Sequence, residues 1–570
     1  MRITYNDKLN KLLNPYLESL LKEKTSLEPE TLTLFDMFME DLDMGGRYGI
    51  FSEILEPRLE EIIREENIES IANLMDGKLH KLFHYMLGDE FATLFRTYLQ
   101  LEARCPHTIG YDRRAQRSTH PSNHLDHARD AWLQFLKLRA TGFSVEAILK
   151  GGNTPEDIEE FSGYMNSSYW LAAQIAQGNE TVIEYLHQVL TSENNANRLQ
   201  RWYLHAIAIS GHRPLLELEG KLLPAAKLQE GLRQAIVETM DEGCPESYLY
   251  LFSIIYHNGL QRFASVKRSI AVCTGIGEQD SSERITNKYV DLIWNFLNHP
   301  EAARNTLQSK DTVELYLALW SIGFYDTDEI RVIVPDIIRK GAKHQIQTLL
   351  YFLRCTQSSQ MNHLISKDAF EVWHDDPKVV AAILPLYMDG LYLSRYSDNK
   401  ETPALSDYFE TPEEAVRQYE YLKQVYQSIS AKETYSPYVF PWDSIILTRS
   451  DVVLKMAYIA WMTNDARLRE ELCEYLPALE SYSRASYIGI VMAHTESKVE
   501  QEYVLQSLGD RSTDIRDEAY KVLSEMSLSP EQYQSIEELL RFKYSEMRIN
   551  AINLLMKQPK EQLTAVSADC

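Results

Sequence analysis

The chain of 570 residues carries 58 Lys and Arg against 83 Asp and Glu, which gives a formal net charge of −25. This balance argues against nucleic acid or an anionic membrane as a partner of the whole chain, because phosphate contacts need local Lys and Arg. Hydrophobic residues make up 44% of the sequence, which is enough for a folded interior. The 23 glycines and 20 prolines are few for this length, and their scarcity favours a mostly helical chain with short turns.

The cysteines and the hydropathy pattern together predict a cytoplasmic protein. The six cysteines are scattered without a CxxC pair, at 105, 244, 273, 355, 473 and 570, as is typical of idle thiols in a reducing compartment. The first residues, MRITYNDKLNKLLNPYLESLL, lack the apolar core of a signal peptide. The longest nearly apolar run, residues 315–325, is shorter than the roughly 20 residues that a membrane helix needs.

Residues 1–104 are predicted to form an N-terminal helical region. Apolar residues recur there at helical spacing, as in the stripe Leu55, Leu59, Ile62 and Ile63. Residues 105–300 are predicted to continue as degenerate helical repeats. Within them, residues 105–122 (CPHTIGYDRRAQRSTHPS) show no periodicity and are predicted to be a His- and Arg-rich loop.

Residues 301–390 are predicted to hold further helical repeats. Three apolar helices, TVELYLALWSI, HQIQTLLYFL and PKVVAAILPLYM, begin near Asp311, Lys343 and Asp376. Their spacing of 32–33 residues suggests one recurring unit. Residues 391–442 are predicted to be an insertion or linker with one helix, 413–428, between polar, proline-containing stretches. Insertions of this kind map to loops on one face of a repeat array, often the binding face, but a tethered insertion without a partner is an equal alternative.

Residues 443–570 contain the clearest internal repetition. Ile515, Ala519, Val522 and Leu523 return 32 residues later as Met547, Ala551, Leu554 and Leu555. Spacing of i, i+4, i+7 and i+8 places one apolar stripe on each helix. A period of this length describes a helix pair that buries its stripe only by stacking on its neighbours. We therefore predict an all-α fold, an α-solenoid of stacked antiparallel helix pairs with irregular loop insertions.

The unit LGDRSTDIRDEAYKVLSEM (508–526) resembles a HEAT repeat, within the wider class of armadillo-type folds. The resemblance rests on an Asp in the turn, an Asp and an Arg opening the second helix, and an Ala and Leu stripe. It implies a ladder of charge-assisted hydrogen bonds between neighbouring repeats. The residues that it assigns to this ladder are Asp510, Asp514, Arg516 and Arg548.

A second resemblance extends further along the chain. The stretches SVKRSIAVCTG, LYLALWSI, FPWDSIIL and KYSEMRINAINLLMK resemble landmarks in the N-terminal region of long, uncharacterised bacterial proteins related to MolR, a proposed molybdate regulator. This resemblance implies no activity. It allows the chain to be the N-terminal module of a longer protein.

One group of residues in the sequence is a weak candidate for a metal site. Cys and His near the predicted loop are candidate metal ligands: Cys105, His107, His120, His124 and His127. Their spacing matches no standard zinc knuckle, so we expect no metal and no cofactor, with zinc as the alternative. The pair His80 and His84 lacks the glutamate of a zinc protease, since Lys81 stands in its place.

Basic residues around the same loop form a candidate surface for anions or a partner: Arg104, Arg113, Arg114, Arg117 and Arg129. They have three possible ligands: a phosphate, an acidic segment of a partner, or acids of the chain itself. No nucleophile elbow or Walker loop occurs. We therefore expect no catalytic residues, and the leading prediction is a non-enzymatic scaffold for protein–protein interaction. The alternatives are a regulatory or metal-binding protein with its site at residues 104–132, or a module of a longer chain. The oligomeric state stays open.

Overall fold

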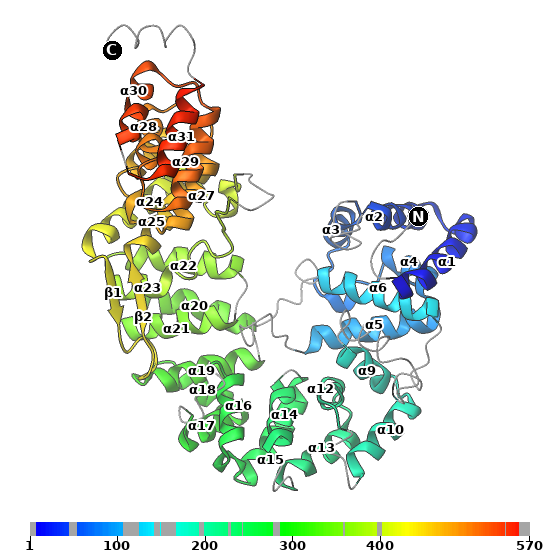
Figure 1. The fold of residues 1–570 in the computed structure, drawn as a ribbon. Coiled ribbons are helices and arrows are strands. Elements are labelled where there is room, and N and C mark those ends of the chain that lie inside the picture. Colours follow the sequence, from blue (N-terminus) through cyan, green and yellow to red (C-terminus); the bar gives the residue numbers. More distant parts are fainter. Residues whose placement is uncertain are drawn as a thin grey trace. The chain divides into compact units, whose positions relative to one another are not determined.

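The computed structural model describes residues 7–44, 54–105, 125–141, 149, 167–192, 199–225, 230–241, 243–276, 285–325, 327–356, 359–395, 402–541 and 543–557. Within these ranges the chain is all-α apart from one two-stranded sheet (Figure 1). Contacts divide the chain into two compact units. The first comprises Met1–Leu307 and Leu317–Ile330, and the second comprises Gln308–Tyr316 and Arg331–Cys570.

The first unit is built from helices of one to four turns. In chain order they are α1 (Asp7–Glu23), η1 (Lys24–Ser26), α2 (Pro29–Met44), α3 (Leu55–Glu65), η2 (Ile71–Asn73), α4 (Lys78–Leu87), α5 (Asp89–Arg104), α6 (Leu125–Thr141), α9 (Ser167–Ala176), α10 (Glu180–Thr191), α12 (Arg201–Ser210), α13 (Arg213–Ala225), α14 (Glu230–Asp241), α15 (Pro245–His257), η4 (Leu260–Arg262), α16 (Ala264–Cys273), α17 (Asn287–Asn298) and α18 (Pro300–Thr306).

From α9 to α17 these helices form two stacked rows. The first helices of successive pairs contact one another in the order α9, α12, α14 and α16, and the second helices do so in the order α10, α13, α15 and α17. The turn before α15 packs closely on α12, because Cys244 N donates to the Ala208 carbonyl over 3.0 Å. A Cβ at Gly243 would lie only 2.7 Å from the Ala208 Cβ, so this approach requires glycine. The described helices from α9 to α17 therefore stack as pairs.

Two helices, α19 (Thr312–Tyr325) and α20 (Thr327–Lys340), contain the boundaries between the units. The elements that follow belong to the second unit: α21 (Lys343–Thr356), α22 (Ser359–Trp373), α23 (Pro377–Ile383), η5 (Leu405–Asp407), α24 (Pro412–Ser428), β1 (Lys432–Tyr435), β2 (Ile445–Thr448), α25 (Arg449–Thr463), α26 (Ala466–Leu472), η6 (Leu476–Ala478), α27 (Ser481–Val491), α28 (Lys498–Ser507), α29 (Thr513–Glu525), α30 (Pro530–Glu538), η7 (Leu539–Arg541) and α31 (Ser545–Leu555).

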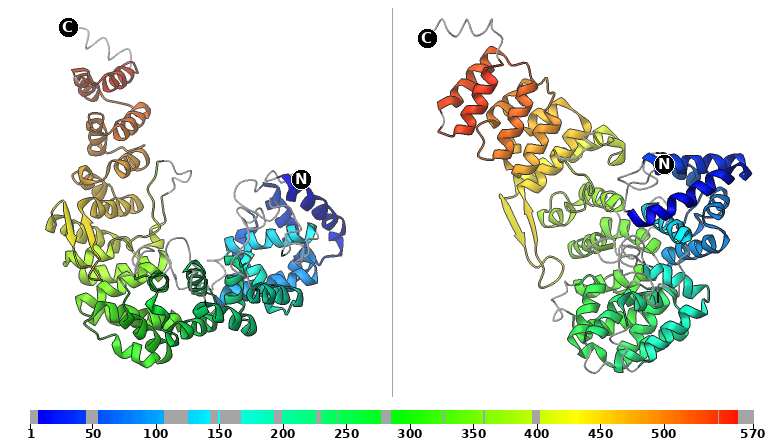
Figure 2. Two further views of the ribbon diagram at one scale, coloured as in Figure 1. Left: turned by 60° about the horizontal axis from the view of Figure 1, so that its bottom comes forward. Right: turned by 45° about the vertical axis from the view of Figure 1, so that its right-hand side comes forward.

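The second unit also stacks its helices in two rows. One row runs through α25, α27, α29 and α31, and the other through α26, α28 and α30. Figure 2 shows these layers following one another from yellow to red. The stripe read from the sequence lies inside, because Ile515, Ala519 and Leu523 are buried on α29 and Met547, Ala551 and Leu554 are buried on α31. The prediction of an all-α, repeat-like fold is confirmed.

The predicted insertion at 391–442 contains the expected helix, α24, but it also leads into a hairpin that the sequence reading did not include. Strands β1 and β2 pair antiparallel with Lys432 opposite Thr448 and Tyr435 opposite Ile445. The loop between them packs back on earlier helices, since the Phe440 ring lies 5.3 Å from that of Tyr316 and 5.2 Å from that of Tyr351. The aromatic residues that looked like an irregular loop thus cover helices about 90 to 125 residues earlier in the sequence.

Helix α23 is shorter than its apolar run suggests. The run continues to Met388, but the helix ends at Ile383 because Pro385 follows and the chain turns back on itself. Met388 adopts a positive φ of 53°, which is uncommon for a residue with a side chain. Among the described residues, no helix is both long enough and apolar enough to cross a membrane.

Candidate functional site

The most informative feature of the second unit is an extended stretch of chain, residues 391–395 (Leu-Tyr-Leu-Ser-Arg), which we call the strap. It follows the turn after α23 and forms hydrogen bonds to α25, α27 and α29, one helix from each of three successive layers. Leu393 and Ser394 are buried, whereas Tyr392 is 68% exposed. The strap is therefore seated on the helices through Leu393 and Ser394, while the Tyr392 side chain is left exposed.

Polar groups on α25 and α27 hold the first part of the strap. The Tyr458 hydroxyl on α25 donates to the Leu391 carbonyl over 3.0 Å, and burial raises the pKa of Tyr458 to about 12. This hydroxyl therefore stays protonated and remains a donor. On α27, the Tyr482 hydroxyl lies 2.7 Å from Ser394 Oγ. The Arg395 backbone N–H donates to Ser486 Oγ over 3.2 Å. The helices thus form hydrogen bonds to the backbone of the strap as well as to its side chains.

Arg395 anchors the end of the strap on α29. Its guanidinium donates to the Asp514 carboxylate and, through Nη1, to the Asp514 carbonyl at 3.1 Å. Nη1 also lies 3.7 Å from Glu518 Oε1. The Arg395 side chain is 7% exposed and that of Glu518 is 9% exposed. The Asp514 side chain, by contrast, is 54% exposed. Charge-assisted bonds are stronger than neutral ones, so Arg395, itself buried and facing two carboxylates, has the geometry of an anchor residue.

The turn that delivers the strap is fixed by a buried histidine of α22. His363 Nδ1 accepts from the Met388 backbone N–H at 3.0 Å. Its Nε2 must then carry the proton, and it donates to the Tyr408 carbonyl at 2.8 Å. One neutral imidazole therefore ties α22 to the chain on both sides of the strap. This role is structural, because both ring nitrogens are already engaged.

The residues assigned to the HEAT-like ladder divide into three groups. Asp510 accepts from Arg484 of the preceding layer at 2.7 Å, and Arg516 donates to Glu546 of the following layer at 3.0 Å. Arg516 also donates to the Asp510 carbonyl at 3.0 Å. Asp514 differs from the expectation. It faces the strap and binds Arg395, because the strap, rather than a neighbouring repeat, covers the start of α29.

Arg548 is the last of the four residues that the HEAT resemblance assigns to the ladder. It stands on α31 where Arg516 stands on α29, but it is exposed, and no ion pair to it occurs within the described residues. An additional bridge joins the other row of helices: Arg469 of α26 donates to Glu500 of α28 at 2.7 Å, with Glu500 1% exposed. Sequence reasoning missed this bridge, although the 31-residue spacing of the two charges was a usable signal.

The predicted Cys, His and Arg cluster lies largely outside the described residues. His107, Arg113, Arg114, Arg117, His120 and His124 fall in the range 106–124, which is not described, and His127 and Arg129 belong to α6 with side chains that are not described. Cys105 is buried, and its Sγ lies 3.7 Å from the Ile209 carbonyl as a donor. Arg104 pairs with Glu246 at 2.9 Å. Within the described residues no group of His, Cys, Asp and Glu is placed to hold a metal ion.

The sequence matches one known protein family over most of its length. A model described as a family of unknown function (DUF5724) matches residues 34–569. The chain belongs to this family. No curated protein and no solved structure matches the chain.

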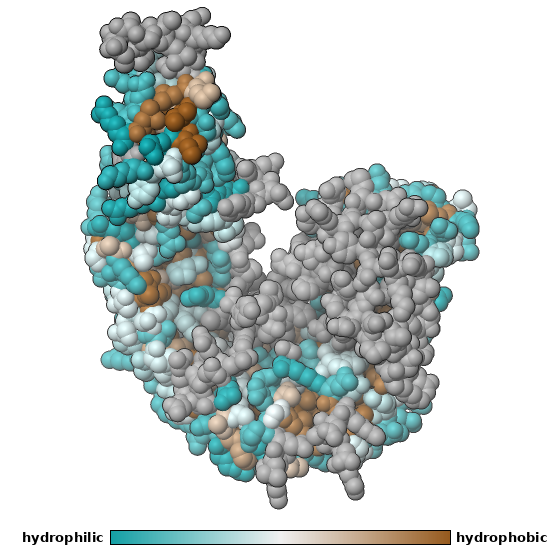
Figure 3. Space-filling view, in the orientation of Figure 1, coloured by the Kyte–Doolittle hydropathy of each residue, from teal (hydrophilic) through white to brown (hydrophobic). Residues whose placement is uncertain are grey.

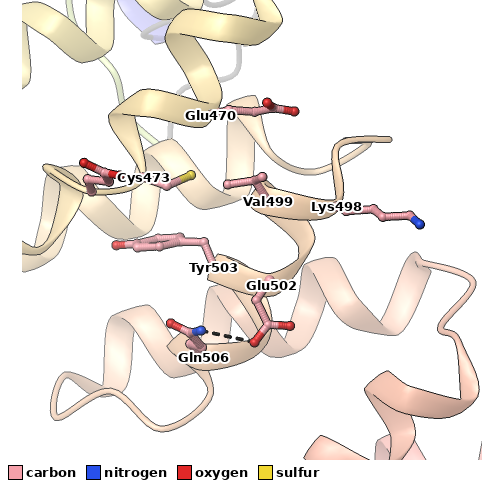
Figure 4. Close-up of a pocket in the computed structure, with 8 residues that line it drawn as sticks. Glu470, Cys473, Lys498, Val499, Glu502, Tyr503 and Gln506 are labelled. Carbon is pink, nitrogen blue, oxygen red and sulfur yellow. Dashed lines mark hydrogen bonds between the residues drawn. The ribbon is translucent and has the colours of Figure 1, made fainter.

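A second candidate site in this DUF5724 chain is an open pocket of about 440 Å³ between α26 and α28. Figure 4 shows Cys473 and Tyr503 beside Val499 on its inner side, with Lys498 directed outward. Burial, with the nearby Glu500 and Glu470, raises the pKa of Cys473 to about 12, so the thiol is protonated at neutral pH. A protonated thiol is a poor nucleophile. The pocket is a weaker candidate than the surface under the strap.

Proposed function

We propose that this chain is a non-enzymatic scaffold for protein–protein interaction. In this proposal the surface formed by α25, α27 and α29 receives an extended, arginine-containing segment of a partner protein. The observation that supports it most is the strap itself. A segment about 60 to 120 residues distant in sequence from the helices beneath it is held as a bound peptide would be.

The proposal depends on how the strap is recognised. Three successive layers contribute different groups: α25 supplies a hydroxyl that donates to the main chain, α27 supplies two hydroxyls, and α29 supplies the acidic anchor. A surface that binds main chain through fixed polar groups and selects one arginine through two carboxylates suits other segments of the same chemistry. The strap then acts as an occupant in cis that a partner segment replaces.

The proposal also covers the partner class and the location. With a formal charge of −25 and an acidic anchor under the strap, a basic protein segment is favoured over nucleic acid. The cysteines 105, 244, 273 and 473 are buried, which is consistent with thiols in the reducing cytoplasm. Kinship with HEAT repeats and with MolR-related bacterial proteins belongs to the same proposal, supported by the stacked rows and by the Arg484 and Arg516 bridges.

A peptide-binding measurement on the full chain tests this function. A fluorescein-labelled peptide with the sequence of residues 389–396 is titrated with the wild-type chain and with Arg395→Ala, which releases the anchor of the strap. We expect the variant to bind the peptide about tenfold more tightly than the wild type, because the competing strap is weakened. Fluorescence anisotropy gives both dissociation constants.

Matched variants distinguish specific recognition of the peptide from a general effect of the negative charge on α29. Asp514→Asn with Glu518→Gln, in the Arg395→Ala background, should abolish peptide binding. Asp517→Asn removes one carboxylate from the same helix, α29, and should leave binding unchanged, since Asp517 makes no bond to the strap in the described residues. Absence of peptide binding to Arg395→Ala, with the variant still folded by circular dichroism, would show that the strap is only a structural clamp.

A further inference from the structure

Helix α31 carries an apolar stripe on its outer side. Ile549, Ile552 and Met556 are 55%, 47% and 77% exposed, and their i, i+3 and i+7 spacing places them on one face. Tyr544, just before the helix, is 70% exposed. Figure 3 shows the resulting apolar patch over this end of the unit. The opposite face of α31 is already used, because Met547, Ala551 and Leu554 are buried within the layer stack.

The preceding layer shows what such a face normally looks like in this chain. The positions 32 residues earlier on α29 are Asp517, Tyr520 and Ser524. These are polar side chains, and they are partly buried where α31 packs against α29. The face that α31 turns outward is thus more apolar than the equivalent face that is covered. A repeat face that meets only water normally carries polar side chains, so this apolar face is suited to contact with another surface.

The charges around the stripe indicate the kind of partner. Arg484 and Arg516 each bind a carboxylate of the next layer, at 2.7 and 3.0 Å. Arg548 occupies the equivalent position on α31, is exposed and has no carboxylate partner among the described residues. Residues 541–557 hold four cations, Arg541, Lys543, Arg548 and Lys557, and one acid, Glu546, which already binds Arg516. Lys557 Nζ donates to the Ser524 carbonyl of α29 at 3.1 Å. The stretch is locally basic on a chain of net charge −25.

A second copy of this chain fits the patch poorly. Two α31 helices packed face to face would bring the same cations together from both sides, and like charges across an interface disfavour association. An acidic helix meets the opposite condition, because it supplies both an apolar stripe and carboxylates. Helix-in-groove recognition of this type is read through residues at i, i+3, i+4 and i+7.

We propose that the outer face of α31 docks an acidic amphipathic helix of another protein, which packs as the next layer of the array. The docked helix places apolar residues on Ile549, Ile552 and Met556 and a carboxylate near Arg548, as Glu546 does for Arg516. This surface is separate from the one under the strap and does not depend on the function proposed above.

The test uses the full chain and a defined probe. The probe is a labelled synthetic peptide of residues 543–557 carrying Lys543→Glu, Arg548→Glu and Lys557→Glu, which keeps the stripe that covers α29 and makes the helix acidic. We expect saturable binding by fluorescence anisotropy, weakened about tenfold by Ile549→Ser with Ile552→Ser. Arg548→Glu should also weaken binding, and added salt should reduce the effect of this substitution.

Controls make each outcome decisive. Val499→Ser removes an equally exposed apolar residue, 47% exposed on α28, and should leave binding unchanged. The unsubstituted peptide of residues 543–557, which is basic, should bind more weakly than the acidic probe. The proposal is overturned if the acidic probe does not bind, or if it binds the Ile549→Ser, Ile552→Ser chain equally well. It is also overturned if light scattering shows a dimer of the wild-type chain that these two substitutions dissociate, because the occupant is then a second copy.

Discussion

His363 shows how one buried side chain makes the second unit sensitive to pH. Burial is the main reason why the pKa of His363 is lowered from 6.5, with Lys367 and Lys455 acting in the same direction and the Tyr408 carbonyl and Glu414 opposing them. The neutral ring accepts from the Met388 N–H and donates to Tyr408. A second ring proton would face the Met388 N–H, so protonation breaks the tie to the turn.

The first prediction follows from this linkage. Just below pH 6.5 the unfolded chain binds a proton at this histidine that the folded chain does not, so stability is complete above pH 6.5 and falls as the pH is lowered through it. His363→Gln keeps an acceptor and a donor but cannot titrate. We expect it to cost about 1–3 kcal/mol at pH 8 and to show a shallower loss of stability between pH 7 and 5 than the wild type. Urea unfolding across this pH range measures both, and parallel curves would contradict the assignment.

Lys455 on α25 is a cation whose burial lowers the stability of the folded chain. Burial lowers the pKa of Lys455 to about 8 from 10.5, although Asp389 and Asp451 favour the charged form. Between pH 8 and 10.5 the unfolded chain binds the additional proton, so this residue makes stability rise with pH in that window. Below pH 8 the folded chain carries the full cost of the buried charge.

The second prediction is therefore a gain of stability. Lys455→Met keeps the length of the side chain and removes the charge, and it should raise the free energy of unfolding at pH 7 by about 1–3 kcal/mol. The difference from the wild type should shrink as the pH approaches 10.5. A Met variant that is less stable at pH 7 would show that the ammonium makes a net favourable contact, such as that with the Tyr458 ring 5.4 Å away.

At the scale of elements, the bridges between layers set how one helix pair stacks on the next. Glu500 is the most buried of them. It accepts two bonds from Arg469 of α26, at 2.9 and 2.7 Å, and a further bond from the Thr495 hydroxyl. With one helix supplying the guanidinium and the next supplying the carboxylate, the relative position of α26 and α28 is strongly constrained.

The third prediction concerns this pair. Glu500→Gln leaves the Arg469 charge without its partner and should cost about 3 kcal/mol, as expected when one member of a buried ion pair is removed. Asp336→Asn breaks the exposed pair with Lys340, whose side chains are 73% and 76% exposed, and should cost no more than about 0.5 kcal/mol. Chemical denaturation of both variants makes the comparison. Equal effects would mean that burial does not govern these bridges.

At the scale of the whole molecule, the chain divides into two compact units whose sequences interleave between residues 308 and 330. In stacked repeats each layer contacts only its neighbours, so cooperativity extends along the rows and weakens where contacts thin. Unfolding as one all-or-none transition is then not expected.

The fourth prediction is that scanning calorimetry resolves two transitions. Glu500→Gln should lower the temperature of one of them, and Leu171→Ala, at a fully buried position on α9 in the first unit, should lower the other. Each substitution should leave the second transition near its wild-type temperature. A single transition shifted by both substitutions would show that the units unfold together.

The sequence by itself determined the parts of this protein that depend on local periodicity. The stripe on α29 and α31 and the helix starts near Asp311 and Asp376 follow from spacings that repeat within one or two helix pairs, and both aspartates cap their helices. The layer-to-layer role of Asp510 and Arg516 was implied by the resemblance to HEAT repeats. The hairpin was not predicted because β1 lies in a polar, proline-containing stretch without a helical period. Strand β2 has only four residues, Ile445–Thr448, and falls at the start of the stretch predicted as HEAT-like repeats. The ion pair between Arg469 and Glu500 was not predicted, because single charges on acidic helices usually indicate a solvent-exposed face.

Only the tertiary structure decided which distant segments meet. Arg395 reaches Asp514 across 119 positions of the chain, and Thr312 donates to the Val439 carbonyl across 127. Neither contact leaves a periodic trace, because an extended segment has no heptad or helical repeat and its partner is chosen by the fold. The same holds for the exposed stripe of α31. Its residues are visible in the sequence as a helix face, but whether that face is covered depends on where the neighbouring layers lie.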